Sequence, residues 1–333
     1  MSVLTISGSP HVHTDQSVPK VMYGVVIAMV PAMLVSFYFF GIGAAKVMLT
    51  SILACLFFEW VIQKYVIKGP VTINDGSALI TGILLAFNVP SSLPVWITII
   101  GAFVSIGIAK MSFGGLGKNP FNPALVGRVF LLMSFPVQMT TWPVPKPLFG
   151  GEVLTDAVTG PTPLGILKEG LRAGQTVQEI MPQLPEYVSE LIGNQGGSLG
   201  EVSALALLLG AVYMLIRRII TWHIPVSYLL SVVVFSGIFW LIDPTYYMDP
   251  LFHLITGGMM LGIFYMATDM VSSPINHRGM IIFGVGCGVL TMVIRLWGAY
   301  PEGVSFAILI MNAFTPLINR GIKPKRFGIA KKQ

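Results

Sequence analysis

Charged residues are scarce in this chain, and cysteine is almost absent. Asp, Glu, Lys and Arg make up 10% of the 333 residues, whereas a soluble domain averages about 25%. The two cysteines, Cys55 and Cys287, lie far apart inside apolar runs. We therefore predict packing roles for both cysteines and no zinc or iron–sulfur site. Residues 1–20 contain no apolar stretch before a cleavage site, so we expect no signal peptide there.

Apolar residues dominate instead, at 54% of the chain and a mean hydropathy of +0.78. A helix that spans the bilayer core needs about 20 apolar residues, or fewer where other helices shield it from lipid. We find ten such segments, of which the third and fifth are short: 21–41, 45–66, 76–90, 93–111, 123–136, 201–217, 224–242, 250–268, 279–298 and 303–319. The sequence therefore predicts an all-α integral membrane protein with about ten transmembrane helices, five on each side of a polar loop at 137–200.

The distribution of Lys and Arg predicts which side of the membrane each loop faces. If residues 1–20 form a cytoplasmic tail, the cytoplasmic side receives fourteen basic residues: Lys20, Lys64, Lys68, Lys110, Lys118, Arg217, Arg218, Arg278, Arg320, Lys323, Lys325, Arg326, Lys331 and Lys332. The opposite side receives four, namely Lys46, Lys146, Lys168 and Arg172. We expect a multi-pass protein of the inner (cytoplasmic) membrane, with both termini and the basic tail 320–333 inside and the 137–200 loop outside. This bias also explains the net charge of +6, so we expect no nucleic-acid partner.

The two predicted membrane halves, 21–136 and 201–319, show weak similarity to each other. "LITGILLAFNVPSS" in the first half resembles "LITGGMMLGIFYMATDMVSSP" in the second, and "NPFNP" resembles "NAFTP". Because each half has five segments, related halves would have opposite orientations. This pattern predicts two five-helix inverted repeats with some helices interrupted near the membrane midplane. Chance similarity between common membrane residues is the alternative.

The stretch "KMSFGGLGKNPFNPALVGR" is rich in Gly, Asn and Pro and separates two apolar segments. Gly114, Gly115 and Gly117 allow the backbone to turn or to approach a ligand closely. Asn122 and Pro123 can start a helix whose free N–H groups face a polar ligand. A tight, well-capped cytoplasmic loop without a ligand is the alternative.

Several ionisable residues lie within or beside apolar segments, where a charge is costly unless it is paired. Arg128 lies in the fifth segment, and Glu59, Asp75 and Asp269 are its candidate partners. Asp269 lies in "MATDMVSSP", where we expect the helix to break and expose oxygens that suit a hard cation such as Na+. We predict that Glu59, Asp269 and Arg128 belong to an ion path. The alternative for Arg128 and Asp75 is that they reach water at the membrane surface.

The polar loop contains "DAVTGPTPLG", residues 156–165. From the residues alone, Thr162 is expected to cap a helix that starts at Pro163, because threonine is favoured at the cap and proline at the first helical position.

Six ordered blocks of the chain resemble the D subunits of the Rnf electron-transport complex, which are related to the B subunit of the sodium-translocating NADH:quinone reductase. The blocks are "SGSPHVHTDQSVPKVMYGVVIAMVPAM", "FGGLGKNPFNPALVGR", "DAVTGPTPL", "GSLGEVSALALLLG", "GGMMLGIFYMATDMVSSP" and "YPEGVSFAILIMN". The resemblance covers nearly the whole chain. The longer N-terminal extension typical of the reductase subunit is missing, which favours the Rnf family.

The resemblance implies a covalent flavin. In the family, FMN is joined through its phosphate to the last threonine of an Asp-x-x-Ser/Thr-Gly-Ala-Thr motif, which corresponds to Thr162 here. Asp156, Thr159 and Gly160 match the motif, while Pro161 replaces the usual alanine. A dedicated flavin transferase attaches the FMN outside the cytoplasm, on the side to which the charge distribution assigns Thr162.

The resemblance also implies a function, as a membrane subunit of a redox-driven ion translocase. The family's complex passes electrons from reduced ferredoxin through partner subunits to NAD and couples this transfer to export of Na+ or H+. We expect the chain to relay electrons within the lipid bilayer beside the A, B, C, E and G subunits. The reductase relative further suggests a non-covalent riboflavin, for which Gly114, Gly115 and Gly117 leave room. The alternatives are the reductase B subunit itself, a non-redox channel or secondary transporter, and a purely structural scaffold.

Overall fold

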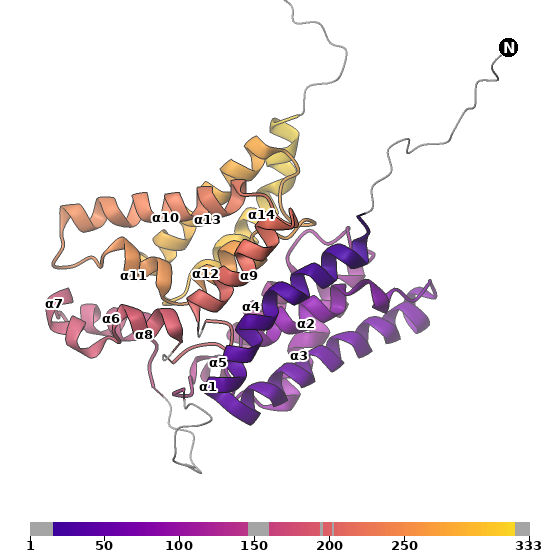
Figure 1. Cartoon of the computed structure of the whole chain (residues 1–333), viewed down its shortest axis with the longest axis horizontal. Helices are drawn as coiled ribbons and strands as arrows, with labels where there is room; N and C mark the ends of the chain where they lie inside the picture. The colour runs from indigo at the N-terminus through magenta and orange to yellow at the C-terminus, as the bar shows by residue number, and fades with distance from the viewer. Residues whose placement is uncertain (1–15, 146–159, 194–195, 202, 324–333) are drawn as a thin grey trace, which may run out of the picture.

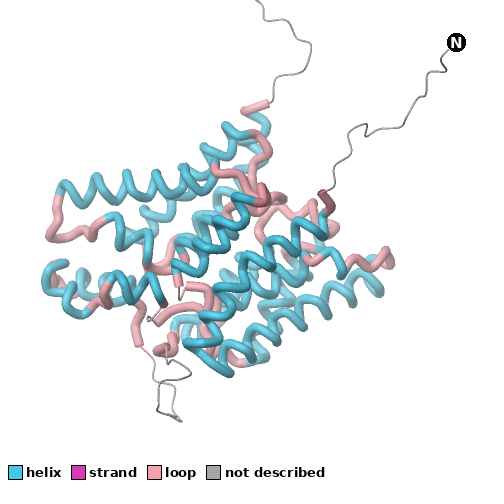
Figure 2. The backbone as a smooth tube through the Cα atoms, viewed as in Figure 1, coloured by secondary structure: helices cyan, strands magenta, loops and turns pink. Residues whose placement is uncertain are grey.

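The computed structural model describes residues 16–145, 160–193, 196–201 and 203–323, and every regular element in these ranges is a helix (Figure 2). Four of the described helices are long and apolar enough to cross a membrane: Val18–Ile67, Val95–Phe113, His223–Ile242 and His277–Trp297. Three shorter apolar helices span Ser77–Phe87, Pro123–Ser134 and Ala204–Ile216. These helices confirm an all-helical membrane protein.

The first half begins with a long element that turns back on itself (Figure 1). Helix α1 (Val18–Val61) runs into the π-helical segment η1 (Ile62–Ile67), but at Gly41 the backbone leaves the helix, with φ 55° and ψ −132°. Only glycine adopts such angles readily, so the first two predicted segments form a hairpin. The remaining elements of this half are η2 (Ile73–Asp75), α2 (Ser77–Phe87), α3 (Val95–Phe103), η3 (Val104–Ile108), η4 (Met111–Phe113), α4 (Pro123–Ser134) and α5 (Pro136–Thr140).

The predicted polar loop contains a small helical unit, which lies below α10 (His223–Ile242) and α11 (Pro250–Ile255) at the left of Figure 1. Its elements are α6 (Pro163–Arg172), α7 (Val177–Ile180), η5 (Met181–Gln183) and α8 (Tyr187–Ile192). The unit shares an apolar cluster with the start of α11 and the loop before it, formed by Leu164, Leu167, Val177, Ile180, Met248 and Phe252. The loop therefore folds against the second half instead of extending into solvent.

The second half contains two long helices, α10 and α13, and one interrupted region. Its elements are α9 (Ala204–Ile216), α10 (His223–Ile242), α11 (Pro250–Ile255), α12 (Met259–Leu261), η6 (Gly262–Met266), α13 (His277–Trp297) and α14 (Val304–Gly321). The segment predicted at 250–268 is not one helix. It breaks at Gly257, which has φ 66°, and the Arg295 side chain donates to the carbonyls of His253 and Thr256, which the break leaves free at the end of α11.

A single large apolar core joins the two halves. Helices α1 and α9 approach so closely that a Cβ on Gly210 would lie 1.9 Å from the carbonyl oxygen of Ala28. The hydroxyl of Tyr265 donates to the same carbonyl over 3.1 Å, which closes the contact between α1 and η6. Cys55 and Cys287 are fully buried and unpaired, as the prediction of packing roles requires.

Candidate functional site

Three interrupted helices meet inside the molecule. Helix α2 ends at Phe87, just before Asn88, α4 begins after Asn122, and η6 ends at Met266. The Asn122 side-chain oxygen accepts from the backbone N–H groups of Ala124 and Leu125, while its amide nitrogen donates to the Met266 carbonyl over 3.3 Å. One side chain therefore caps α4, as the sequence predicts, and also ties α4 to the end of η6.

Arg128 lies one turn further along α4 and is buried, with 5% of its surface exposed. Its Nε donates to the Asn88 carbonyl over 3.3 Å. Its guanidinium forms an ion pair with Glu302 and a hydrogen bond with the Ser305 hydroxyl. The predicted partners, Glu59, Asp75 and Asp269, are therefore wrong, and so is the alternative that Arg128 reaches water. The partner acid, Glu302, lies in the loop before α14, 174 residues away in the sequence.

Glu59 also has a buried partner. The Lys110 ammonium lies 2.6 Å from the Glu59 carboxylate and 2.6 Å from the Ser77 hydroxyl. Glu59 is fully buried and Lys110 is 1% exposed. The count of loop charges assumed that Lys110 is a solvated loop cation, and this is wrong. Lys110 lies just before the turn at η4, and its side chain reaches back between α1 and α2.

Asp269 lies in the break that the sequence predicts. Helix η6 ends at Met266 and α13 does not begin until His277. The half-buried Asp269 carboxylate accepts from the Val271 N–H over 3.2 Å and from the Ser272 hydroxyl over 2.8 Å. The carboxylate thus stabilises the turn, and one edge of it faces a cavity.

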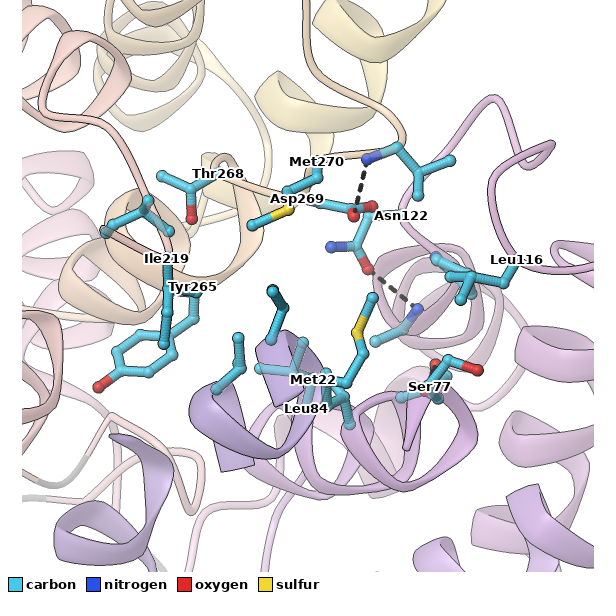
Figure 3. A pocket seen from close by; sticks show the side chains of 18 of the residues that line it. Met22, Ser77, Leu84, Leu116, Asn122, Ile219, Tyr265, Thr268, Asp269 and Met270 are labelled. Atoms are coloured by element: carbon cyan, nitrogen blue, oxygen red, sulfur yellow. Dashed lines mark hydrogen bonds between the residues drawn. The ribbon is translucent and has the colours of Figure 1, made fainter. Parts of the chain in front are cut away.

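This cavity opens between the two halves and has an empty volume of about 760 Å³, part of it open to solvent. Asn122 and Asp269 lie on one side of it, and Met22 and Leu84 lie on the opposite side (Figure 3). The Lys110 side chain and Asn119 also line it. The arrangement offers a mostly apolar space with a few hydrogen-bonding groups.

The predicted glycines shape one wall of this cavity without lining it. Gly114, Gly115 and Gly117 have φ values of 104°, 89° and 89°, a region that residues with a Cβ rarely occupy. The turns they form carry Leu116, whose side chain does line the cavity.

Thr162 caps helix α6, as its sequence context predicts. Its hydroxyl oxygen accepts from the Gly165 N–H over 3.1 Å, and Pro163 occupies the first helical position. The side chain is 8% exposed. Gly160 donates its N–H to the Trp142 carbonyl over 3.0 Å. Two further residues of the predicted motif, Asp156 and Thr159, lie outside the described residues.

A buried acid in the helical unit beside α6 was not predicted. Glu190 on α8 is fully buried, and neither of its carboxylate oxygens has a hydrogen-bond partner among the described residues. Burial, and then the nearby Asp249 carboxylate, raise the pKa of Glu190 to about 8. The Tyr187 hydroxyl donates to Asp249. The only sequence signal was an acid at an apolar position of a short helix.

The fold and these contacts define a class of protein: an all-helical, multi-pass membrane protein whose interrupted helices are held together by buried ion pairs. The chain belongs to the NQR2, RnfD, RnfE family, whose family model matches residues 5–328. This match confirms the membership that the six sequence blocks indicated.

Curated relatives cover almost the full chain. The chain is 45% identical to the D subunit of the Na(+)-translocating ferredoxin:NAD(+) oxidoreductase complex of Acetobacterium woodii, over 98% of this chain and 96% of the relative. It is 44% identical to the D subunit of the proton-translocating ferredoxin:NAD(+) oxidoreductase complex of Clostridium ljungdahlii, over 98% and 97%. It is 40% identical to the D subunit of the ion-translocating oxidoreductase complex of Stutzerimonas stutzeri, over 94% and 92%.

Proposed function

We propose that the protein is the D subunit of an ion-translocating ferredoxin:NAD+ oxidoreductase complex. The observation that carries this proposal is similarity along nearly the whole chain to subunits of that name, at 45% and 44% identity. The chain then acts as one membrane subunit of a redox enzyme, beside the A, B, C, E and G subunits. One of these relatives is named for Na+ and the other for protons, so the coupling ion is one of these two.

Within this function, Thr162 is the attachment point of a covalent FMN. The local structure fits a phosphoester there, because the Thr162 oxygen lies at the N-terminus of α6, beside the Gly165 N–H. The free N–H groups and the dipole of a helix N-terminus favour a phosphate group. When bound, FMN supplies one-electron transfer chemistry, while the protein sets its position. A flavin transferase is then required for maturation.

The cavity between the two halves suits a second, non-covalent flavin. Its lining is mostly apolar with a few polar groups, which is the character of small-molecule sites. Asn119, Asn122 and Asp269 provide polar groups for the edges of a flat ring system, and apolar side chains provide its faces. These residues would hold riboflavin by hydrogen bonding and stacking.

The proposed topology has ten crossings in two inverted five-helix repeats. The Gly41 hairpin supports it, because α1 then supplies two antiparallel crossings. Helix α1 begins and α14 ends on the same side of the molecule, while α6 to α8 lie on the opposite side (Figure 1). This arrangement supports cytoplasmic termini and a flavin-bearing segment outside.

The buried charges are the proposed ion path. It contains the Glu59–Lys110 pair, Asp269 at the helix break, and Arg128 with its partner Glu302. Ionisable groups at membrane depth are costly and often mark such paths. Neutralising Glu59 or Asp269 without any change in coupled ion transport would remove that residue from the path.

The test of the flavin proposal is in-gel flavin fluorescence under denaturing conditions, after co-expression with an active flavin transferase. The wild-type band should fluoresce, and Thr162→Ala should be dark. Thr176→Ala is the matched control, because Thr176 caps the neighbouring helix α7 and its loss removes a helix cap without removing the attachment site. A dark wild-type band, with the transferase proven on another substrate, would refute covalent attachment. A fluorescent Thr162→Ala band would place the flavin elsewhere.

A secondary transporter or channel is the second candidate. Interrupted helices around a cavity between two halves favour it, because many transporters build their sites in this way. Such a protein needs no flavin, so the same gel separates the two functions.

A further inference from the structure

A second cavity lies between α6 and the ends of α10 and α13, away from the cavity of Figure 3. Its empty volume is about 880 Å³, part of it open to solvent. Helix α6 contributes Lys168 and Arg172 to its lining, α11 contributes His253, and α13 contributes Arg295. Neither the ion pairs described above nor the cap at Thr162 uses this space.

The charged side chains that line this cavity are all basic. Lys168, Arg172 and Arg295 line the cavity, and no Asp or Glu of the described ranges does. The Lys168 ammonium donates to two carbonyl oxygens, those of Tyr300 over 2.8 Å and Arg295 over 3.3 Å. Burial, and then the neighbouring Arg172 charge, lower the pKa of Lys168. An anion in the cavity would relieve this repulsion.

Two buried nitrogens of the lining residues also lack partners. The Nδ1 atom of His253 and the Nε atom of Arg295 have no hydrogen-bond partner among the described residues. Their side chains are almost fully buried, with 2% and 6% of each residue exposed. Glu201 and Glu302 act electrostatically on Arg295 from outside the lining, whereas the described lining places no acid beside Lys168 and Arg172.

The rest of the lining is apolar or aromatic: Leu164, Leu167, Leu171, Tyr246, Tyr247, Met248, Leu296, Trp297, Gly298 and Pro301. The cavity lies where α10 and α13 end, and Trp297 is 55% exposed there. Leu241 and Ile242, at the end of α10, are 75% and 71% exposed. Tyr and Trp gather at the boundary between lipid tails and water. The cavity therefore lies at headgroup depth, beside surfaces that suit acyl chains.

We propose that this cavity binds an anionic phospholipid of the membrane leaflet on that side. The lipid phosphate contacts Lys168 and Arg172, and its acyl chains lie along the exposed ends of α10 and α13. A zwitterionic lipid offers the same phosphate but brings a cation into a site that already holds three. The site should therefore prefer phosphatidylglycerol to phosphatidylcholine. This inference rests on the cavity alone and does not require the flavin proposal.

The experiment uses the full-length protein, purified in mild detergent and stripped of lipid. Binding of phosphatidylglycerol and phosphatidylcholine with identical acyl chains is measured on wild type, on Lys168→Gln/Arg172→Gln and on Arg320→Gln/Lys323→Gln. The last variant removes two positive charges at the other end of the molecule and is the matched control. An interfacial cation contributes about fivefold to the binding of an anionic lipid, so we expect about thirty-fold weaker phosphatidylglycerol binding in the first variant and wild-type binding in the control. Inorganic phosphate is added as a competitor, and the lipid measurements are repeated on Thr162→Ala.

The comparison of the two lipids uses only the wild-type protein. It therefore decides the outcome even if Lys168→Gln/Arg172→Gln does not fold. Equal binding of both lipids by the wild type would overturn the proposal. Equal loss in the two double variants would also overturn it, since the effect would then follow from net charge. Full competition by inorganic phosphate would assign the cavity to a free anion. If lipid binds to Thr162→Ala but not to the wild type, the attached flavin occupies the cavity in the wild type. That result would overturn the lipid proposal but would leave the proposal of covalent flavin intact.

Discussion

The ion pair between Arg128 and Glu302 joins α4 to the start of α14, and its removal should destabilise the protein strongly. Both residues are buried, at 5% and 9% exposure. Replacing Arg128 with Met leaves a buried carboxylate without its cation, which costs about 3–5 kcal/mol. It also leaves the Asn88 carbonyl without the Nε donor. We expect the lower end of this range, about 3 kcal/mol, because unfolded chains in a membrane environment also find polar partners.

The double variant Arg128→Met/Glu302→Leu makes the prediction sharper. Replacing both members of a buried ion pair with apolar residues is often nearly neutral, so the double variant should be more stable than either Arg128→Met or Glu302→Leu. The coupling free energy of the cycle should favour the pair by about 2 kcal/mol or more. Arg217→Met is the control, because Arg217 is exposed at the end of α9 and its loss should change stability by less than about 0.5 kcal/mol.

The measurement is unfolding of the detergent-solubilised protein by titration with a denaturing detergent, followed by circular dichroism. Additive losses in the double variant would refute the reasoning, because they would show that the two charges do not stabilise each other. Single variants as stable as the Arg217 control would show that water reaches both groups. If the double variant keeps its stability but loses coupled ion transport, the ion pair belongs to the ion path and is not needed for the fold.

Three further outcomes follow from the described contacts. Gly210→Ala should destabilise the protein by about 1–3 kcal/mol, because its Cβ would lie 1.9 Å from the Ala28 carbonyl oxygen. Gly321→Ala is the control, because its Cβ meets no atom within 4 Å. Thermal unfolding of both variants measures the difference, and equal melting temperatures would contradict the prediction. Glu190 has an ordinary pKa of 4.5 and a pKa of about 8 in the folded chain. Between these pH values the folded chain holds a proton that the unfolded chain releases, so the free energy of unfolding should fall as the pH rises. Unfolding titrations across this range should show a weaker pH dependence for Glu190→Gln than for the wild type. Thr268→Trp places a bulky ring at the cavity of Figure 3 and should abolish the acid-extractable flavin while the covalent flavin band persists; unchanged extractable flavin would exclude that cavity as its site.

Local sequence signals predicted the elements that position the sites. Thr162 before Pro163 and Asn122 before Pro123 both cap helices in the structure, because capping depends on a few neighbouring residues and on backbone angles that proline fixes. The break around Asp269 was predicted for the same reason, since small polar residues and a proline cluster there. The apolar length of each segment likewise predicted where most long helices lie.

Long-range partners could not be predicted from the sequence. Arg128 was expected beside Glu59, Asp75 or Asp269 but pairs with Glu302, which lies in the loop before α14 and had no distinguishing motif. The pairing depends on how α4 and α14 pack, and no spacing rule within one helix encodes that packing. The continuous segment expected at 250–268 failed for a similar reason, because its break depends on a side chain from α13.

The contacts between the two halves also bear on how ions move. Secondary transporters with inverted repeats commonly alternate by rocking one bundle against the other. In this chain the proposed halves are tied by the Arg128–Glu302 ion pair, by Asn122 donating to the Met266 carbonyl, and by the Tyr265 hydroxyl donating to a carbonyl of α1. A rocking movement would break a buried ion pair in each cycle and would leave buried carbonyls without donors. We infer that these contacts oppose movement of the halves relative to each other. Such an arrangement would suit the proposed electron transfer between flavins at constant positions, and it would confine the proposed ion movement to local changes at the buried charges and at the helix breaks.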